Sequence, residues 1–264
     1  MGDGKRTILE GHGLSKWYGA GRRRRQVLFD VDVRLRAGEC LAVIGGSGSG
    51  KTTLTRVLLG LEHADSGSVE YYGELVRGDV ARKLRAQSGL VFQSPFDSLD
   101  PRWRIGRSIG EPLRLHYPDW SRDHVSERVA EALDMVSLDS GTYVNRFPID
   151  LSGGQAQRAA IARAIVLNPQ YLFCDEPNSG LDPMTSVLID NLIHEITQEY
   201  NITTVINTHD MNSVLEIGEH ILFIYKGRKW WEGSKHDILD ADNRELNDFV
   251  FASAMAKRAK KAGL

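Results

Sequence analysis

The chain has 264 residues, of which 41% are hydrophobic and 26% are charged, so it can bury a substantial core beneath a polar surface. Lysine and arginine number 33 against 35 acidic residues, and the net charge of −2 gives no reason to expect a surface that binds nucleic acid. No apolar run approaches the roughly 18 residues of a membrane span, and no signal-peptide pattern opens the chain. We therefore expect a cytosolic, soluble protein. If it serves a membrane, we expect it to do so from the cytoplasmic face.

The first part of the chain, residues 8–36, is expected to be rich in β-strands. Residues 28–35 alternate well enough for a strand with one buried face. Ahead of this strand lies Tyr18, an aromatic residue that belongs either to a strand edge or to a ligand site. Residues 22–25 are four arginines in what should be a hairpin loop, and a solvated charge run explains them better than a site for nucleic acid or anionic lipid.

A glycine-rich loop lies between a buried strand predicted over 40–44 and a helix predicted over 54–59. It fits the pattern G-x-x-x-x-G-K-[ST], and its glycines allow the backbone N–H groups to turn inward around a phosphate. A surface turn rarely places Lys-Thr between such a strand and helix, and no G-x-G-x-x-G register fits, which excludes a Rossmann site. Lys51 would reach the β- and γ-phosphates of a nucleotide, and the Thr52 hydroxyl would ligate Mg²⁺. The predicted phosphate site consists of Gly45, Gly46, Ser47, Gly48, Ser49, Gly50, Lys51, Thr52 and Thr53.

Beyond this loop, short apolar runs alternate with helical patterns. Strands are predicted over 67–73, 89–92, 171–174, 203–207 and 221–225, and helices over 124–136, 158–167 and 183–200. The alternation predicts a mostly parallel sheet covered by helices on both faces. In the last of these helices, Leu188, Leu192 and Ile196 have the spacing of an apolar stripe. Cys40 and Cys174 lie in strand-like runs and are expected to be buried thiols.

Two acidic residues, Asp175 and Glu176, follow the strand predicted at 171–174. In open α/β sheets, ligands collect at the carboxyl ends of the strands. One carboxylate can hold Mg²⁺ while its neighbour polarises the attacking water. The alternative is a pair of acids that simply begins a loop. As a general base, Glu176 would contribute about 10²- to 10⁴-fold to the rate.

A second candidate anion site is the run Leu151-Ser152-Gly153-Gly154-Gln155, which precedes a predicted helix. One nucleotide in one monomer does not need two such sites, whereas two monomers placed head to tail do. At this point the sequence resembles the ATP-binding cassette (ABC) ATPases, in which LSGGQ is the signature motif. The resemblance covers about residues 8–238.

The resemblance implies an α/β fold of the P-loop NTPase type, with a mostly parallel sheet, an N-terminal antiparallel β-subdomain and an inserted helical subdomain. Residues 1–264 would form a single ABC ATPase domain. Its core with the β-subdomain would comprise 8–94 and 158–238, its helical signature subdomain 95–157, and its C-terminal helical tail 239–264.

The resemblance also implies roles for individual residues on the protomer that holds the nucleotide. Tyr18 would stack on adenine, and Gln93 would touch Mg²⁺ and the attacking water. Asp175 would be the metal-binding acid and Glu176 the catalytic base. His209, which follows the strand predicted at 203–207, would contact the γ-phosphate.

Other residues match the signature motif and the D-loop. Ser152, Gly153, Gly154 and Gln155 form the signature motif, which would contact the ATP held by the opposite protomer. Asp182 would belong to the D-loop, the segment that follows the acidic pair.

The implied function is that of an ATP-hydrolysing motor subunit of an ABC transporter. It would use ATP and Mg²⁺ at the cytoplasmic face of the inner or plasma membrane, together with a second protomer in a homo- or heterodimer, permease subunits and, for an importer, a substrate-binding protein. A nucleic-acid partner is not expected. Without the resemblance to transporters, two other classes would compete. Soluble cassette ATPases of DNA repair or translation typically carry a coiled-coil insertion or two cassettes, and the sequence shows neither. P-loop kinases or GTPases would leave the signature motif, Gln93 and His209 without a role.

Two parts of the chain are similar to different transporter subfamilies. Residues 92–102 are similar to dipeptide, oligopeptide and nickel importer ATPases. Residues 178–183, 207–213 and 246–251 are similar to phospholipid-trafficking, Mla-type ATPases. Because the surface that couples to the membrane subunit would lie near Gln93, the first similarity weighs more. Peptide or metal import is therefore the first hypothesis and phospholipid transport the second.

Overall fold

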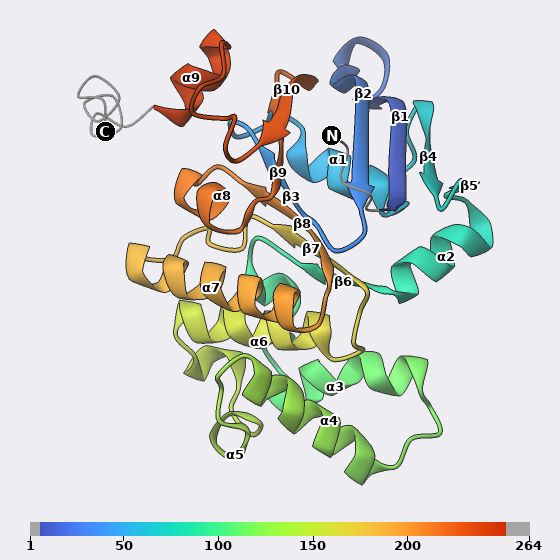
Figure 1. Ribbon diagram of the computed structural model, residues 1–264. Coiled ribbons are helices and arrows are strands. Elements are labelled where there is room, and N and C mark those ends of the chain that lie inside the picture. The colour runs from blue at the N-terminus through green and yellow to red at the C-terminus, as the bar shows by residue number, and fades with distance from the viewer. Residues whose placement is uncertain (1–5, 252–264) are drawn as a thin grey trace. The chain divides into compact units, whose positions relative to one another are not determined.

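The computed structural model describes residues 6–251 and shows two compact units (Figure 1). One unit comprises the chain up to Leu84 and from Val205 onward, and the second runs from Arg85 to Thr204. Residues 252–264 of the predicted helical tail lie outside the described residues, as do residues 1–5 at the start of the chain. The predicted subdomain limits at residues 94, 157 and 238 stay predictions.

An antiparallel sheet lies in the first unit, with strand order β2-β1-β4-β5. Its strands are β1 (Thr7–Tyr18), β2 (Arg25–Arg36), β4 (Ser66–Tyr71) and β5 (Glu74–Leu75). The connection between β1 and β2 contains the short 3-10 turn Gly21–Arg23, and the arginines at 22–25 are exposed there, as predicted for a solvated hairpin loop. Arg24 lies over the ring of Trp17 at 5.1 Å and pairs with Asp65 at 3.9 Å.

The remaining strands of the first unit include β3, which leads into the glycine-rich loop. β3 (Cys40–Ile44) is buried throughout and runs parallel to β9 (His220–Tyr225), which pairs antiparallel with β10 (Arg228–Ser234). The helices α1 (Lys51–Leu58), α8 (Met211–Ile217) and α9 (Arg244–Val250) belong to the same unit. Two further elements, α2 (Gly78–Ala86) and β8 (Thr203–Thr208), extend over the limits of the units.

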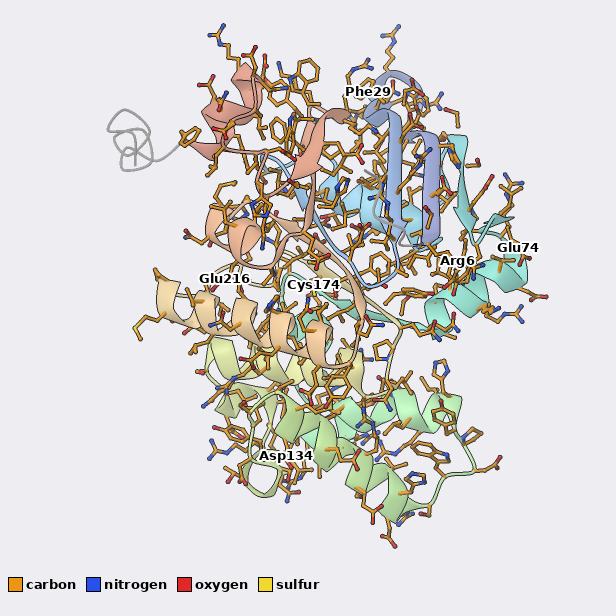
Figure 2. All side chains as sticks on the ribbon, viewed as in Figure 1. Arg6, Phe29, Glu74, Asp134, Cys174 and Glu216 are labelled. Carbon is orange, nitrogen blue, oxygen red and sulfur yellow. The ribbon has the colours of Figure 1, made fainter. Side chains whose placement is uncertain are left out.

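The second unit contains one parallel strand pair and five α-helices among its elements. β6 (Ser88–Val91) pairs with β7 (Tyr171–Asp175), and the 3-10 turns are Pro95–Asp97 and Pro148–Asp150. The helices are α3 (Ile105–His116), α4 (Arg122–Met135), α5 (Ser140–Tyr143), α6 (Gly153–Ile165) and α7 (Pro183–Glu199). Cys174 on β7 and Cys40 on β3 are buried free thiols, as predicted; Figure 2 labels Cys174.

The start of α6 differs from the prediction. The sequence pattern places it at Arg158, but the helix begins at Gly153. Ser152 and Gln155 form a capping box that satisfies backbone N–H groups of the first turn. The two signature glycines therefore lie inside the helix rather than ahead of it, despite their low helix propensity.

The apolar stripe predicted on α7 is wrong at Leu188, whose exposed fraction is 63%. Leu192 and Ile196 are buried as predicted. In the preceding turn, Ile189 is the buried residue instead of Leu188. Leu188 and Ile189 both fit a helical spacing with Leu192 and Ile196, so the spacing alone does not decide between them.

Glu232, in the β9–β10 hairpin, forms ion pairs with two neighbouring side chains. His220 lies 2.8 Å and Lys229 2.9 Å from its oxygens. The hydrogen bond with His220, followed by that from Lys229, lowers the pKa of Glu232 from 4.5 to about 2, against the effect of burial. A carboxyl group whose pKa is lowered by folding stabilises the folded state above its unfolded pKa, and this contribution is lost as the pH falls towards the folded value.

We expect Glu232→Gln to lower the free energy of unfolding at neutral pH by about 1 kcal/mol, since the group is partly exposed and its ion pairs are screened. The difference from the parent should shrink as the pH falls through about 4.5 towards 2. Urea denaturation at several pH values measures it. The exposed Glu195, changed to Gln, is the control; a Glu232→Gln deficit that stays constant with pH would contradict the ion-pair explanation.

Candidate nucleotide-binding and hydrolysis site

The glycine-rich loop connects β3 to α1 in a conformation that requires glycine. Gly45, Gly48 and Gly50 have φ values of 152°, 72° and 110°. A Cβ at Gly45 would lie 2.3 Å from the carbonyl oxygen of Ile224, so no other residue fits there without a shift of the backbone. The loop can therefore turn its N–H groups towards an anion at the N-terminus of α1.

Lys51 begins α1, and its exposed fraction is only 4%. Its Nζ donates to the carbonyl oxygens of Gly45 at 2.9 Å and Gly46 at 3.3 Å, so the ammonium group lies over its own loop. Within residues 6–251, the buried Ser49 Oγ has no hydrogen-bond partner. A buried hydroxyl without a partner is costly unless a ligand supplies one. The lysine, this hydroxyl and the loop N–H groups together fit a nucleotide phosphate.

Tyr18, at the end of β1, is fixed next to the same loop. Its hydroxyl donates to a carboxylate oxygen of Glu62 and lies 3.4 Å from Thr53 Oγ1 on α1. Burial, and then the hydrogen bond with Glu62, raise the pKa of Tyr18. Tyr18 as a whole remains 39% exposed, which leaves surface for a stacked ligand. The structure thus brings Tyr18 to the predicted phosphate site, and Glu62 is a contributor that the sequence pattern did not reveal.

His209 is exposed directly after β8, where the sequence places it. Two residues before it, the buried Asn207 accepts a hydrogen bond from Thr55 Oγ1 of α1 at 3.1 Å. This buried bond links the helix of the phosphate loop to the strand that carries His209. Asp210 caps α8, because its Oδ1 accepts from the N–H of Asn212 at 2.9 Å.

In the second unit, the predicted acidic pair meets Gln93. Val91 is paired with Cys174 in the parallel register of β6 and β7, so Gln93 and Glu176 follow the two strands at the same level. Gln93 Nε2 donates to Glu176 Oε2 at 3.4 Å and to Ser179 Oγ at 3.1 Å. Ser179 is a second partner of Gln93 that sequence reasoning missed.

Asp175 is the last residue of β7. Glu176 follows it with φ 47°, a left-handed conformation that is uncommon for residues other than glycine and typical of functional turns. A Mg²⁺ ion in a phosphate-loop protein is usually held by one or two protein oxygens together with phosphate oxygens. In the first unit the Thr52 hydroxyl, and in the second unit the Asp175 carboxylate, are each oxygen groups of the kind that ligate Mg²⁺. Among the described residues, no cluster of three or more His, Cys, Asp or Glu could hold a metal alone.

Asp182 is the N-cap of α7 in this structure. Its Oδ1 accepts from the N–H groups of Met184 and Thr185 at 3.1 Å each. The hydrogen bond from the Thr185 side chain and then that from its backbone lower the pKa of Asp182. Just before it, Asn178 Nδ2 donates to the buried Asp190 at 2.7 Å, which ties the segment after Glu176 to α7.

The signature glycines pack against this same segment. A Cβ on Gly154 would lie 2.4 Å from Thr185 Cγ2, and one on Gly153 would lie 3.2 Å from Leu181 Cδ2. Ser152 and Gly153 are exposed. The second unit therefore presents the signature motif next to the segment that contains Asp182.

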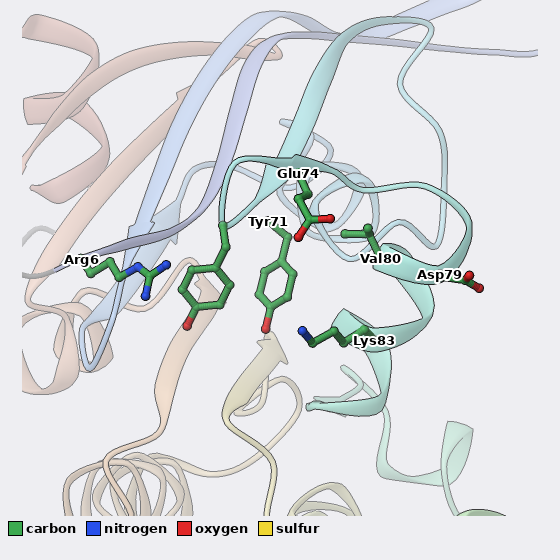
Figure 3. Close-up of a pocket in the computed structure, with 7 residues that line it drawn as sticks. Arg6, Tyr71, Glu74, Asp79, Val80 and Lys83 are labelled. Carbon is green, nitrogen blue, oxygen red and sulfur yellow. The ribbon is translucent and has the colours of Figure 1, made fainter.

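A separate pocket of about 520 Å³ lies in the first unit, near the β4–β5 hairpin and α2 (Figure 3). None of the predicted site residues lines it. In Figure 3 the Arg6 side chain points towards an aromatic ring, and its guanidinium lies 4.5 Å from the ring centre of Tyr72.

The comparison with protein families matches residues 28–179, over half of the chain, to the model described as ABC transporter. The chain belongs to the ABC transporter family, and it is an ATP-binding cassette of that family. Among curated relatives, the oligopeptide transport ATP-binding protein OppF of Escherichia coli (strain K12) is 37% identical over 215 residues. The match covers 80% of this chain and 64% of OppF, so the chain spans somewhat less than two thirds of that relative's length.

Solved structures of cassettes have the same fold. The dimeric ABC transporter cassette MJ0796 aligns with a TM-score of 0.78 and 30% identity, covering 86% of this chain and 99% of that one. Its dimeric post-hydrolysis state with ADP and phosphate gives 0.77 and 29%, with the same coverage. The protein cbiO1 of Clostridium perfringens, part of the ABC transporter complex cbiONQ, gives 0.79 and 26%, covering 98% and 99%. These matches confirm the predicted P-loop NTPase fold with its antiparallel and parallel sheets.

Proposed function

We propose that this chain binds ATP with Mg²⁺ and hydrolyses it as the motor subunit of a peptide importer, working as a head-to-tail dimer. The observation that carries the proposal is the hydrogen bond between Gln93 and Glu176. An amide and a carboxylate at the ends of two parallel strands are suited to hold and polarise an attacking water. The dimeric cassette relative that was solved with ADP and phosphate supports the same activity.

On the protomer that holds the nucleotide, each group has a defined task in this proposal. The loop N–H groups and Lys51 bind the phosphates, and Tyr18 stacks on the base. Thr52, Asp175 and Gln93 would hold Mg²⁺, which would neutralise charge on the phosphate oxygens. Glu176 then accepts a proton from the water. His209 contacts the γ-phosphate.

The signature motif serves the nucleotide of the opposite protomer. Ser152 Oγ accepts from the backbone N–H of Gln155 at 3.3 Å and keeps its own proton to donate. The N–H groups of Gly153 and Gly154 lie in the first turn of α6, where the helix dipole favours an anion. Asp182 acts through its cap of α7, on whose Thr185 Gly154 packs.

The cargo class rests on the relatives. OppF is named for oligopeptide transport, and the match to it extends well beyond the part of the chain with the importer-like motif at 92–102. This supports peptides over metals. The similarity of three later segments to phospholipid-trafficking ATPases stays a prediction.

The partner of the second unit is proposed to be a permease subunit, docked on a groove of about 690 Å³ that follows Gln93 in the chain. Phe96, 53% exposed, and Trp103 supply apolar surface, and Arg163 pairs with Glu111 at 2.8 Å beside them. The buried Ser108 Oγ also lines the groove and has no hydrogen-bond partner among the described residues. Among residues 6–251, none of the helices has the length and apolar character needed to cross a bilayer.

We expect Phe96→Glu to weaken association with a co-expressed peptide-importer permease at least about tenfold, because an exposed aromatic anchor that the permease would cover is replaced by a charge. Leu115→Glu on α3 is the matched control, since Leu115 is exposed and does not line the groove. Co-purification and peptide-stimulated ATP hydrolysis in proteoliposomes measure the effect. Unchanged association would place the docking surface elsewhere. ATP hydrolysis that is stimulated by DNA or ribosomes instead would favour a soluble cassette ATPase.

A further inference from the structure

Besides the packing of its glycines, the signature motif is joined to α5 by a hydrogen bond from the Gln155 side chain. Its Oε1 accepts from the backbone N–H of Ser152 at 3.0 Å, and its Nε2 donates to the hydroxyl of Tyr143 at 2.9 Å. Because the Ser152 N–H needs an acceptor, the amide oxygen must face Ser152, and the NH₂ group must then face Tyr143. Both ends of the glutamine amide are thus hydrogen-bonded, the oxygen to Ser152 and the nitrogen to Tyr143.

Tyr143 is itself held firmly. It ends α5, whose N-cap Asp139 accepts from the N–H of Thr142 at 2.8 Å. The guanidinium of Arg146 lies 5.0 Å from the centre of the Tyr143 ring. Such a cation–π contact restricts the ring without using its hydroxyl.

The segment after Tyr143 is fastened to the start of α3. The N–H of Gly106 donates to the carbonyl of Val144 at 2.9 Å, and the N–H of Ile105 donates to that of Arg146 at 2.8 Å. A Cβ on Gly106 would lie 2.4 Å from Val144 Cγ2, so the two backbones approach closely. α3 begins two residues after Trp103, which lines the groove proposed for the permease. Hydrogen bonds therefore connect the end of that groove to the signature motif through Tyr143.

We propose that Tyr143 is a positioning residue for the signature motif: its hydroxyl orients Gln155, and through Gln155 it fixes Ser152 for the ATP of the opposite protomer. This inference rests on the proposed head-to-tail dimer. Tyr143 acts on dimerisation and not on the binding of ATP to a monomer, since the phosphate loop and Tyr18 belong to the other unit.

The test uses the full chain with Glu176→Gln, in which ATP should accumulate in the dimer. Adding Tyr143→Phe removes only the hydroxyl, and we expect the ATP concentration for half-maximal dimerisation to rise about three- to tenfold. Analytical ultracentrifugation measures dimerisation, and a fluorescent ATP analogue measures monomer affinity, which should not change. Tyr117→Phe is the control, an exposed tyrosine of the same unit that stacks on Trp120 at 4.5 Å.

A double-mutant cycle separates positioning from packing. If Tyr143 acts through Gln155, Tyr143→Phe should add little once Gln155→Leu is present. Full additivity of the two changes, or equal dimerisation with and without Tyr143→Phe, would overturn the inference while leaving the dimer intact. A Glu176→Gln parent that never dimerises on ATP would overturn the proposed dimer itself, and the inference with it.

Discussion

Glu176→Gln is expected to reduce ATP hydrolysis about 10²- to 10⁴-fold while ATP binding is retained. The substitution keeps the shape of the side chain, and the new amide oxygen can still accept the hydrogen bond that Gln93 Nε2 now donates to Glu176 Oε2 at 3.4 Å. An amide, however, cannot accept a proton from water at neutral pH. Phosphate release at saturating ATP and Mg²⁺ gives the turnover, and titration with a fluorescent ATP analogue gives the affinity.

Glu195→Gln provides the matched control for this change. Glu195 is exposed on α7 in the same unit, so the variant loses the same charge without affecting the strand ends. The Glu176→Gln protein should also accumulate as a dimer in ATP, because binding continues when hydrolysis stops. Turnover equal to that of the parent would refute Glu176 as the base.

The phosphate loop was the part of the site most fully predictable from sequence. Its conformation depends on residues that are adjacent in the chain: an apolar strand, glycines that accept positive φ, and a helix that starts at Lys51. Local sequence carries most of that information, although the helix was predicted to begin at residue 54 and begins at Lys51. The observed bounds of β3 are identical to the predicted range 40–44.

Contacts between distant segments could not be derived in the same way. The bond from Gln93 to Glu176 depends on the register of β6 against β7, and a shift of one residue would separate the two side chains. Glu62, the partner of Tyr18, lies outside any motif, and Ser179, the partner of Gln93, lies in the D-loop segment but was not predicted to contact Gln93. Apolar spacing has no information about such polar pairs, because their positions follow from packing.

Short or polar elements were also beyond the sequence patterns. α2 and β10 have few apolar side chains, and the sequence analysis predicted neither. The start of α6 was hidden because glycine disfavours helix, yet the Ser152–Gln155 capping box begins it at Gly153. In this case a local side-chain cap outweighs intrinsic propensity.

Lys51→Ala is expected to weaken the binding of ATP itself, about 10- to 100-fold, because a charge-assisted hydrogen bond to phosphate is lost. The lysine is buried over the loop, where water cannot replace its charge, and its Nζ already lies 2.9 Å from the carbonyl oxygen of Gly45. Titration with a fluorescent ATP analogue in the presence of Mg²⁺ measures the loss. Lys83→Ala, an exposed lysine of the same unit that Figure 3 labels, is the control for the change of charge.

A second variant separates phosphate binding from loop structure, since Lys51 also holds the carbonyl oxygens of Gly45 and Gly46. Lys51→Met keeps most of the buried stem but has no donor, so it should bind ATP as poorly as Lys51→Ala while preserving more of the packing. Undiminished binding by both variants would refute the phosphate-clamp role. Together with Glu176→Gln, which should bind and not hydrolyse, the lysine variants should show that binding and hydrolysis depend on different residues. A Lys51 variant with normal affinity but slow turnover would instead assign the lysine to the chemical step.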